Sequence, residues 1–530
     1  MKRNKFIYSV ITLAFGLMAF TSCDDFLDVM PDNRTVIDTE DKVKALLVSA
    51  YLDHDYNLFT ELLSDNVDEY QNTYTERFID EIYQWKDPKE SNNESPESFW
   101  ESAYLAITAA NNALDGIEKM GGATTTMLKE CKGEALLARA YAHFMLVNVF
   151  SLNYNSATAD KALGIPLMYD TGSEIGTVPS RGTVADVYAS IDKDIQEGLS
   201  LIGDSHLSIP KYHFNTKAAY AFATRFYLYY EKWDKAIEYA DKCLGANPKS
   251  LLRDWANSAT LASTFEVRSQ HYVSSELNCN LLLATGYSNA GLAFGPYTIW
   301  KKYTHGPYIS SHETGGATHP WGGSTMLYEA PHSYPGTSYS FVVFWRVPYM
   351  FEYTDAVAGI GYRRSIFPLL TTDECLLNRA EAYIMTKQYD KAAADLTLWM
   401  QNITRSKTTL TPASITNFYK GVAYSYADTT DPLASTVKKH LHPAFSIDEE
   451  GSTQESMLQC VLDFRRVETL HWGLRWFDIK RYGIEYPRRT MDASGSPSKQ
   501  TDFLSKDDPR RAVQLPSKVL DAGVTANPRK

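Results

Sequence analysis

Apolar residues recur every three or four positions along several long segments of the chain, which is the spacing of an amphipathic helix. In one of these segments, Phe99, Ala103 and Ile107 fall on the same helical face. Another segment follows Thr183, which suits an N-cap, with Asp186 in the first turn. Four such segments precede residue 202: Asp41–Leu52, Pro96–Lys119, Glu134–Phe150 and Thr183–Leu201. The pattern therefore predicts a helical N-terminal part.

Two further segments, Ala218–Pro248 and Cys375–Leu396, resemble the helical pairs of tetratricopeptide repeats. In the first pair, Ala236 stands where two helices must approach closely, and the aromatic Trp233 fills space beside it. Ala392 takes the equivalent place in the second pair. A generic helical hairpin without repeat identity is the alternative interpretation of the first copy. The predicted fold is mostly α, a tetratricopeptide-like helical-repeat scaffold in which a long insertion separates the two pairs.

The insertion, residues 250–371, is rich in Gly, Pro, Ser and Tyr and lacks helical periodicity. The segment Phe341–Tyr353 suits one short strand, which Pro348 limits. We expect long loops with a few short strands. Loops of this length inside a compact domain are uncommon unless they are functional, so the insertion is predicted to carry the binding site.

The N-terminus has the order of a lipoprotein export signal. Lys2, Arg3 and Lys5 form a positive region, and Phe6–Phe20 form an apolar stretch too short for a permanent bilayer span. Small residues then precede Cys23, whose thiol can carry a diacylglycerol and whose freed amine can carry a third acyl chain. Several chains anchor a protein stably where one does not. An ordinary cleaved signal with an incidental cysteine is the alternative. Residues 1–22 are predicted to be the signal peptide and residues 23–40 the lipidated tether.

Composition narrows the classes of partner. The formal net charge of -12 disfavours binding to nucleic acid or to anionic headgroups. No apolar run after residue 22 is long enough to span a membrane, so lipid is the only predicted anchor. The remaining cysteines show no CxxC spacing, which leaves a zinc or iron–sulfur site unsupported. They are expected to be mostly free, buried thiols, although one disulfide remains open: Cys131, Cys243, Cys279, Cys375 and Cys460.

Four stretches together resemble the SusD/RagB family of outer-membrane nutrient-binding lipoproteins. They are CDDFLDVMPDNRT from Cys23, FWESAYLAITAANNALDGIE followed by GEALLARAYAHFMLVNVF and GIPLMYD, the helical pair around Ala236, and FPLLTTDECLLNRAEAYIM with RRVETLHWGLRWFDIKRYG. The resemblance implies one SusD-like domain over residues 41–530, with a helical scaffold at 41–249 and 372–530. It also implies a lipid-anchored protein exposed at the surface of the outer membrane, and Asp24 and Asp25 look like the export cue for that location.

The same resemblance implies the partners. Such proteins form a lid on a SusC-like TonB-dependent transporter and hand it an oligosaccharide or polysaccharide. A peptide-binding lid of the same kind of transporter is the alternative. A surface glycoside hydrolase and an adaptor that binds only protein are further hypotheses from other classes. The family does not fix the ligand contacts, because the segment that carries them varies freely.

Sugar recognition needs flat aromatic surface with hydrogen-bonding groups beside it. Trp321 lies in HPWGG, without a core pattern, and its indole is expected to face solvent or ligand, whereas Trp300 in YTIWKKY equally suits a strand core. Core packing or loop anchoring is the alternative for each aromatic residue. The predicted ligand-binding residues are Trp321, Trp300, Tyr303, Tyr308 and Tyr297 in the insertion, and Tyr70, Asn72, Tyr74 and Arg77 in an earlier segment.

Catalytic motifs are absent: the sequence contains no HExxH, Walker loop, GxSxG or GxGxxG. Paired carboxylates remain open, because their separation depends on the fold. The prediction is a protein that is not an enzyme and carries no cofactor or metal. His305, His312, His319 and His332 are spaced too widely for a local metal site and are expected to be exposed on loops. Basic and acidic residues alternate over Val461–Gly483, on a helix–turn–helix pattern, and predict an internal ion-pair network.

Overall fold

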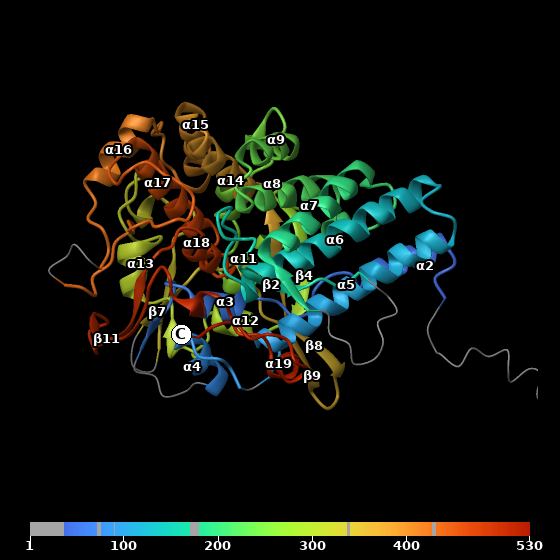
Figure 1. Ribbon diagram of the computed structural model, residues 1–530. Coiled ribbons are helices and arrows are strands. Elements are labelled where there is room, and N and C mark those ends of the chain that lie inside the picture. Colours follow the sequence, from blue (N-terminus) through green and yellow to red (C-terminus); the bar gives the residue numbers. More distant parts are fainter. Residues whose placement is uncertain are drawn as a thin grey trace, which may run out of the picture.

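Helices are the dominant regular elements of the structure, which is a computed structural model (Figure 1). It describes residues 36–70, 76–89, 91–169, 180–336, 340–426 and 431–529. The predicted signal peptide and Cys23 lie outside the described residues. Among the described residues, none of the helices combines the length and the apolar character that crossing a bilayer requires.

The N-terminal helices follow the predicted amphipathic segments closely. Ser95 caps the helix that begins at Pro96, and its hydroxyl accepts the Ser98 N–H at 3.2 Å. Thr183 and Asp186 form a reciprocal capping box, which confirms the predicted start of that helix. The helix that contains Glu134 begins earlier than predicted. The helices are α2 (Glu40–Leu47), α3 (Asn57–Leu63), α4 (Arg77–Tyr83), α5 (Pro96–Lys119), α6 (Thr126–Phe150), α7 (Val184–Leu201), α8 (Thr216–Tyr229) and α9 (Trp233–Leu244).

The two predicted helical pairs stack on each other across the insertion. The first is α8 with α9, and the second is α14 (Thr372–Met385) with α15 (Tyr389–Ile403). Helix α14 packs against both α8 and α9. The Arg225 guanidinium donates to the buried Glu374 carboxylate at 2.7 Å and fixes α8 against α14. The mostly helical scaffold is therefore confirmed.

The insertion differs from its prediction in two ways. It contains the short helices α10 (Trp255–Ser258), α11 (Phe265–Tyr272), α12 (Ala290–Ala293) and α13 (Pro307–Glu313). Helices of four to eight residues are too short to show periodicity, and tertiary packing supports them. Its strands are also longer than expected. Strands β4 (Asn280–Tyr287), β9 (Ile360–Thr371) and β8 (Met350–Asp355) form an antiparallel sheet in that order.

The β8–β9 hairpin lies at the lower edge of the molecule in Figure 1. Pro348 separates β7 from β8, so the single strand predicted in this region is two strands. A second hairpin joins β6 to β7, and a smaller one joins β2 to β3. These strands are β2 (Leu163–Pro166), β3 (Arg181–Thr183), β6 (His332–Pro335) and β7 (Ser340–Val343).

A four-stranded sheet joins distant parts of the chain, with the order β11-β10-β1-β5. Strand β1 pairs parallel with β10 and antiparallel with β5, so that Glu69 lies opposite both Thr490 and Tyr303. The sheet therefore places the N-terminal part, the insertion and the C-terminus side by side. Its strands are β1 (Asp68–Glu69), β5 (Tyr303–Thr304), β10 (Tyr486–Met491) and β11 (Pro497–Leu504).

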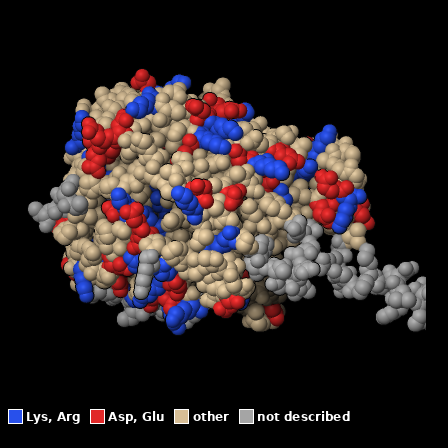
Figure 2. All heavy atoms as spheres, in the orientation of Figure 1, with Lys and Arg blue, Asp and Glu red and all other residues tan. Residues whose placement is uncertain are grey.

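The C-terminal helices are α16 (Pro412–Lys420), α17 (Thr453–Glu468), α18 (Arg475–Arg481) and α19 (Ser517–Asp521). The predicted helix–turn–helix corresponds to α17 and α18. Its arginines are buried and paired, as predicted: Arg465 with Asp478 at 2.7 Å, and Arg481 with Glu381 at 2.6 Å. On the face shown in Figure 2, Lys and Arg are interspersed with Asp and Glu. All five cysteines after Cys23 are buried and free, which confirms the expected thiols.

Lys480 is the exception within this cluster, because its ammonium donates to the backbone oxygens of Asn148 and Ser151 rather than to a carboxylate. Burial, together with the nearby Arg511, lowers the pKa of Lys480 from 10.5 to about 7. Between these two pH values the unfolded chain binds this proton and the folded chain does not, so Lys480 makes stability rise with pH in that window. We expect the wild type to gain stability relative to Lys480→Met between pH 7 and pH 9, as measured by urea unfolding. Lys249→Met, at an exposed lysine, is the control and is expected to show no such trend.

Candidate functional site

Two of the segments predicted to bind ligand meet beside the four-stranded sheet. The Trp300 indole N–H donates to the Glu76 carboxylate at 3.1 Å, across 224 residues of sequence. The Lys302 ammonium lies 2.8 Å from the Asp80 carboxylate and 3.8 Å from that of Glu69. The early segment and the insertion therefore form one local structure, which the sequence did not reveal.

Tyr303 also contributes to the contact between the insertion and α4. Its hydroxyl donates to the Asp80 carboxylate, and its ring lies flat on Tyr83, with 4.0 Å between the centroids and 18° between the planes. Burial, followed by the bond to Asp80, raises the pKa of the Tyr303 hydroxyl. The ring is only 3% exposed. Tyr303 therefore fixes the insertion loop to α4 and leaves little ring surface open.

A hollow of about 310 Å³ opens on the α4 side of the sheet, next to this contact. This volume is in the range of small-molecule pockets. Arg488 forms part of its wall, with its guanidinium between the rings of Tyr83 and Trp85 at 4.1 and 4.2 Å. The lining residues come from β1, the end of α4, β10 and β11, and are Glu69, Gln84, Lys86, Arg488, Thr501 and Asp502.

The residues that line the hollow include both hydrogen-bond donors and hydrogen-bond acceptors. The nearest cation to the Glu69 carboxylate is Lys302 at 3.8 Å, and burial raises the pKa of Glu69. Among the described residues, the Thr501 hydroxyl makes only a long bond of 3.4 Å, to the backbone oxygen of Arg488. Within the described residues, the buried Nε–H of Arg488 has no hydrogen-bond partner. A wall with donors and acceptors and with both signs of charge suits a neutral, hydroxyl-rich ligand.

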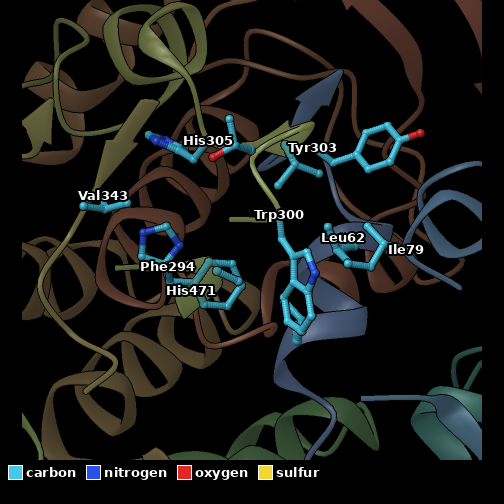
Figure 3. Close-up of a pocket in the computed structure, with 12 residues that line it drawn as sticks. Leu62, Ile79, Phe294, Trp300, Tyr303, His305, Val343 and His471 are labelled. Carbon is cyan, nitrogen blue, oxygen red and sulfur yellow. The ribbon is translucent and has the colours of Figure 1, made fainter. Parts of the chain in front are cut away.

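A second cavity lies inside the protein, and Trp300 and Tyr303 both line it together with His305 and His471 (Figure 3). Its volume is about 10 Å³, which is at the limit for one water molecule. In Figure 3 the Tyr303 ring points away from the other labelled side chains. This cavity is too small for a sugar ring. The Trp300 indole is buried, as its core alternative predicted, but the residue lies in a turn with a φ of 58° rather than in a strand.

Trp321 is buried, so the expectation that its indole faces solvent or ligand is wrong. It is 4% exposed and packs on His319, Phe464 and Trp399, with centroids 4.1, 5.0 and 5.9 Å away. The reason is a tight turn, in which the backbones of His319 and Gly322 bond to each other in both directions. The turn folds the indole inward, although its Gly-rich sequence suggested an open loop.

The other residues predicted to bind ligand do not come together at one site. Tyr308 is half-buried, with its ring stacked on His312 at 4.1 Å, and Tyr297 is half-buried in a separate aromatic cluster. Tyr70 is 2% exposed, and Arg77 is exposed with its guanidinium 2.9 Å from Glu81. Asn72 and Tyr74 lie outside the described residues.

The predicted exposure of the four insertion histidines is only partly correct. His312 is exposed and His332 is half-buried, but His305 and His319 are each 2% exposed. The ring of His305 contacts Thr314, and that of His319 contacts Asp463, each at 2.9 Å. Within the described ranges, no cluster of His, Cys, Asp and Glu is arranged to hold a metal ion.

Sequence reasoning missed all six residues that line the hollow. Glu69 was adjacent to a predicted position, and its place beside Tyr70 was the only available signal. Thr501 and Asp502 gave no signal, because strand pairing alone brings them to β1. The sequence prediction relied on aromatic residues, and the fold buries several of their rings.

Comparison with known proteins agrees with this architecture. Residues 25–228 match a SusD-like family described as starch-binding and associating with the outer membrane. No curated protein matches the chain. A Bacteroides vulgatus protein assigned to sugar binding is 19% identical, with a TM-score of 0.66, and the match covers 93% of this chain and 99% of that one.

Two further crystal structures are similar. A SusD superfamily protein from Bacteroides thetaiotaomicron is 18% identical, with a TM-score of 0.61, over 93% of this chain and 100% of that one. A SusD-like carbohydrate-binding protein from Bacteroides vulgatus is 17% identical, with a TM-score of 0.61, over 91% and 96%. At these identities the structures establish the shared fold.

Proposed function

We propose that this SusD-like protein captures oligosaccharide at the cell surface and delivers it to a SusC-like TonB-dependent transporter. Two findings support the proposal. Residues 25–228 match the SusD-like family described as starch-binding and associating with the outer membrane, and the chain shares its fold with SusD superfamily proteins. The resemblance that the sequence indicated is thereby confirmed. What we propose beyond this resemblance is that the protein captures oligosaccharide and delivers it to the transporter.

One observation carries the proposal: a polar hollow of about 310 Å³, whose Glu69 carboxylate lies 3.8 Å from Lys302 of the insertion. Hydroxyl groups of a sugar need acceptors such as Glu69 and Asp502 and donors such as Lys86 and Gln84. The aromatic residues Tyr83 and Trp85 hold the wall rigid through Arg488. A rigid wall lowers the cost of ordering the site on binding.

The proposal also includes three predictions from the sequence. We infer a lipid anchor at Cys23, a single domain from residue 41 onward with the binding site in or beside the insertion, and binding without catalysis or cofactor. Tyr308 and Tyr297 are the predicted ligand residues whose rings are half-buried rather than buried. Tyr70, Trp300 and Tyr303 are expected to support the site from within, whereas Trp321 belongs to the core beside α17.

Replacement of Glu69 by glutamine is expected to weaken oligosaccharide binding about tenfold, because a hydrogen bond to a charged group contributes about 1–1.5 kcal/mol more than one to a neutral amide. The measurement is isothermal titration of the chain from residue 24 onward with a panel of malto-, xylo-, manno- and fructo-oligosaccharides. Glu101→Gln, an exposed carboxylate on α5, is the matched control and is expected to bind as the wild type does.

Absence of binding to every sugar class by a folded wild-type sample would contradict the proposed function. Binding of mixed peptides in place of sugars would instead support the peptide-binding lid. If Glu69→Gln and Glu101→Gln both retain full affinity for a sugar, the hollow is not where that sugar binds.

A further inference from the structure

Two buried carboxylates on α6 have histidines as their counter-ions. Glu130 and Glu134 lie one helical turn apart and face the connection between α7 and α8. Glu134 is 1% exposed and Glu130 is 9% exposed. Within the described residues, their ion pairs are with His206 and His213 of that connection and with no lysine or arginine. Because a buried carboxylate needs a paired charge, the charge of these histidines decides whether the contact is stable.

His206 lies between the two carboxylates. Its Nδ1 is 3.2 Å from a Glu130 oxygen, and its Nε2 is 2.7 Å from a Glu134 oxygen. A neutral imidazole has a single N–H, so one of its nitrogens would face a carboxylate with a lone pair, whereas an imidazolium donates to both. Burial lowers the pKa of His206, but Glu134 and Glu130 outweigh burial and raise this pKa above 6.5. The geometry therefore favours a protonated His206.

The second oxygen of Glu134 holds the other end of the same connection. It accepts the Tyr51 hydroxyl at 2.7 Å and lies 2.7 Å from Nδ1 of His213. The Tyr51 hydroxyl in turn accepts the backbone N–H of Phe214 at 2.7 Å. At the start of the connection, the backbone N–H of His206 donates to Glu130 at 3.2 Å. Both ends of the connection therefore depend on carboxylates of one helix.

The other ionisable groups near this cluster keep their charge state around neutral pH. Burial alone would raise the pKa of Glu130 and Glu134, but hydrogen bonds from the histidines and from hydroxyl groups hold both below the usual range. Burial raises the pKa of Tyr51, and it raises that of the Cys131 thiol to about 12. The remaining charged groups nearby are Lys44 and Glu40 on α2, and Asp204 at the start of the connection. The histidines are therefore the groups that titrate between pH 6 and pH 9.

The connection also contacts the insertion. Asn215 caps α8, because its side-chain oxygen accepts the Ala218 N–H at 3.0 Å. Its side-chain amide donates to the backbone oxygen of Leu281 on β4 at 2.8 Å. The short helix Pro210–Tyr212 packs against β4 as well. The connection therefore joins α6 to the sheet that ends in the β8–β9 hairpin.

We propose that residues 203–215 form a pH-sensitive latch, which is closed on α6 while His206 carries a proton and opens when His206 releases that proton to solvent. After the release, two buried carboxylates keep their charge without the imidazolium that they shared, and one His206 nitrogen faces an oxygen lone pair. Opening loosens the junction between the N-terminal helices and the insertion sheet. The latch is independent of the proposed sugar binding and uses none of the residues that line the hollow.

The sign of the pH dependence follows from the raised pKa of His206. The closed latch binds the proton more tightly than the open one does, so the proton stabilises the closed state. This stabilisation is fully present below pH 6.5 and is lost as the pH rises through the pKa of His206 in the closed latch. The latch is therefore closed in mildly acidic medium and opens in alkaline medium.

Hydrogen exchange measured by mass spectrometry between pH 6 and pH 9 tests the latch. Peptides that cover residues 203–215 report its opening, and peptides from α17 are the reference. After correction for the intrinsic exchange rate, opening of the wild-type latch is expected to increase by up to about tenfold per pH unit above pH 6.5. His206→Gln, which cannot titrate, is expected to open more at pH 6 and to show no such increase. His312→Gln, at an exposed histidine on α13, is the matched control and is expected to follow the wild type.

Two results would overturn the latch: opening of the wild-type peptides that does not change with pH, and an equal pH dependence in His206→Gln. Glu130→Gln is the second variant, and it keeps the test decisive if His206→Gln does not fold. It removes one of the carboxylates that raise the pKa of His206, so the increase in opening is expected at lower pH than in the wild type. An unchanged profile for Glu130→Gln would also contradict the latch. Because exchange is measured without ligand, none of these results depends on sugar binding.

Discussion

Replacement of Glu313 by glutamine is expected to lower the free energy of unfolding by about 3–5 kcal/mol, the cost of breaking a buried charge network at one partner. The Glu313 carboxylate on α13 is completely buried. It accepts from Lys439 at 2.7 Å, from Arg466 at 2.8 Å and from Arg489 at 2.9 Å. Burial alone would raise the pKa of Glu313, but these three cations hold it well below its usual range.

Glutamine keeps the size of the side chain and removes its charge, so the three buried cations lose their shared counter-ion. The matched control is Glu238→Gln, because Glu238 pairs with Lys242 at 2.6 Å on the surface, with side chains 53% and 45% exposed. A pair of this kind contributes about 0.3–0.5 kcal/mol. Denaturant unfolding measures both variants. Equal stability losses for the two would show that the network around Glu313 does not hold an ionised carboxylate.

The second large effect is expected for Trp321→Ala, which should lower the free energy of unfolding by about 3–5 kcal/mol. The indole fills the space between His319, Phe464 and Trp399, and alanine would leave a cavity there. Because the indole N–H has no hydrogen-bond partner among the described residues, Trp321→Phe removes no bond. We expect the phenylalanine variant to lose clearly less stability.

Unfolding and sugar titration together distinguish the two roles of Trp321. If Trp321 is a core residue, stability decreases from the wild type to Trp321→Phe and further to Trp321→Ala. The folded fraction of each variant then keeps the sugar affinity of the wild type. If Trp321→Ala instead lost affinity and kept full stability, the original hypothesis of a ligand-facing indole would stand. The same comparison applied to Tyr308, which is half-buried, is not expected to show a comparable stability loss.

Local periodicity determined the helical scaffold without any tertiary information. The helix Pro96–Lys119 begins and ends where the sequence placed it, and the N-cap at Thr183, with Asp186 in the first turn, was visible in the residue types alone. These features depend on neighbours three or four positions apart in the chain. Residue types also predicted an internal ion-pair network for the C-terminal helices, but its partners come from more distant positions, since Arg465 pairs with Asp478 and Arg481 pairs with Glu381 of α14.

The insertion was predicted less well because its order comes from distant contacts. Short helices such as α13 have too few residues to show a period, and the Glu313 network that fixes α13 comes from α17, β10 and the segment around Lys439. Whether an aromatic ring lies inside or outside such a loop depends on the partner it meets. Trp321 and Tyr308 look alike in sequence, yet one is buried against α17 and the other is half-exposed.

The sequence by itself therefore determined the helical frame and each of the two helical pairs, since these rest on regular spacing within a continuous segment, and its motifs carried the family resemblance. Only the tertiary structure decided which residues line a site. Glu69, Arg488 and Asp502 are neighbours because strand pairing joins β1, β10 and β11, and no local spacing encodes that pairing. Burial and long-range contacts, rather than residue type, select the side chains that remain open to a ligand.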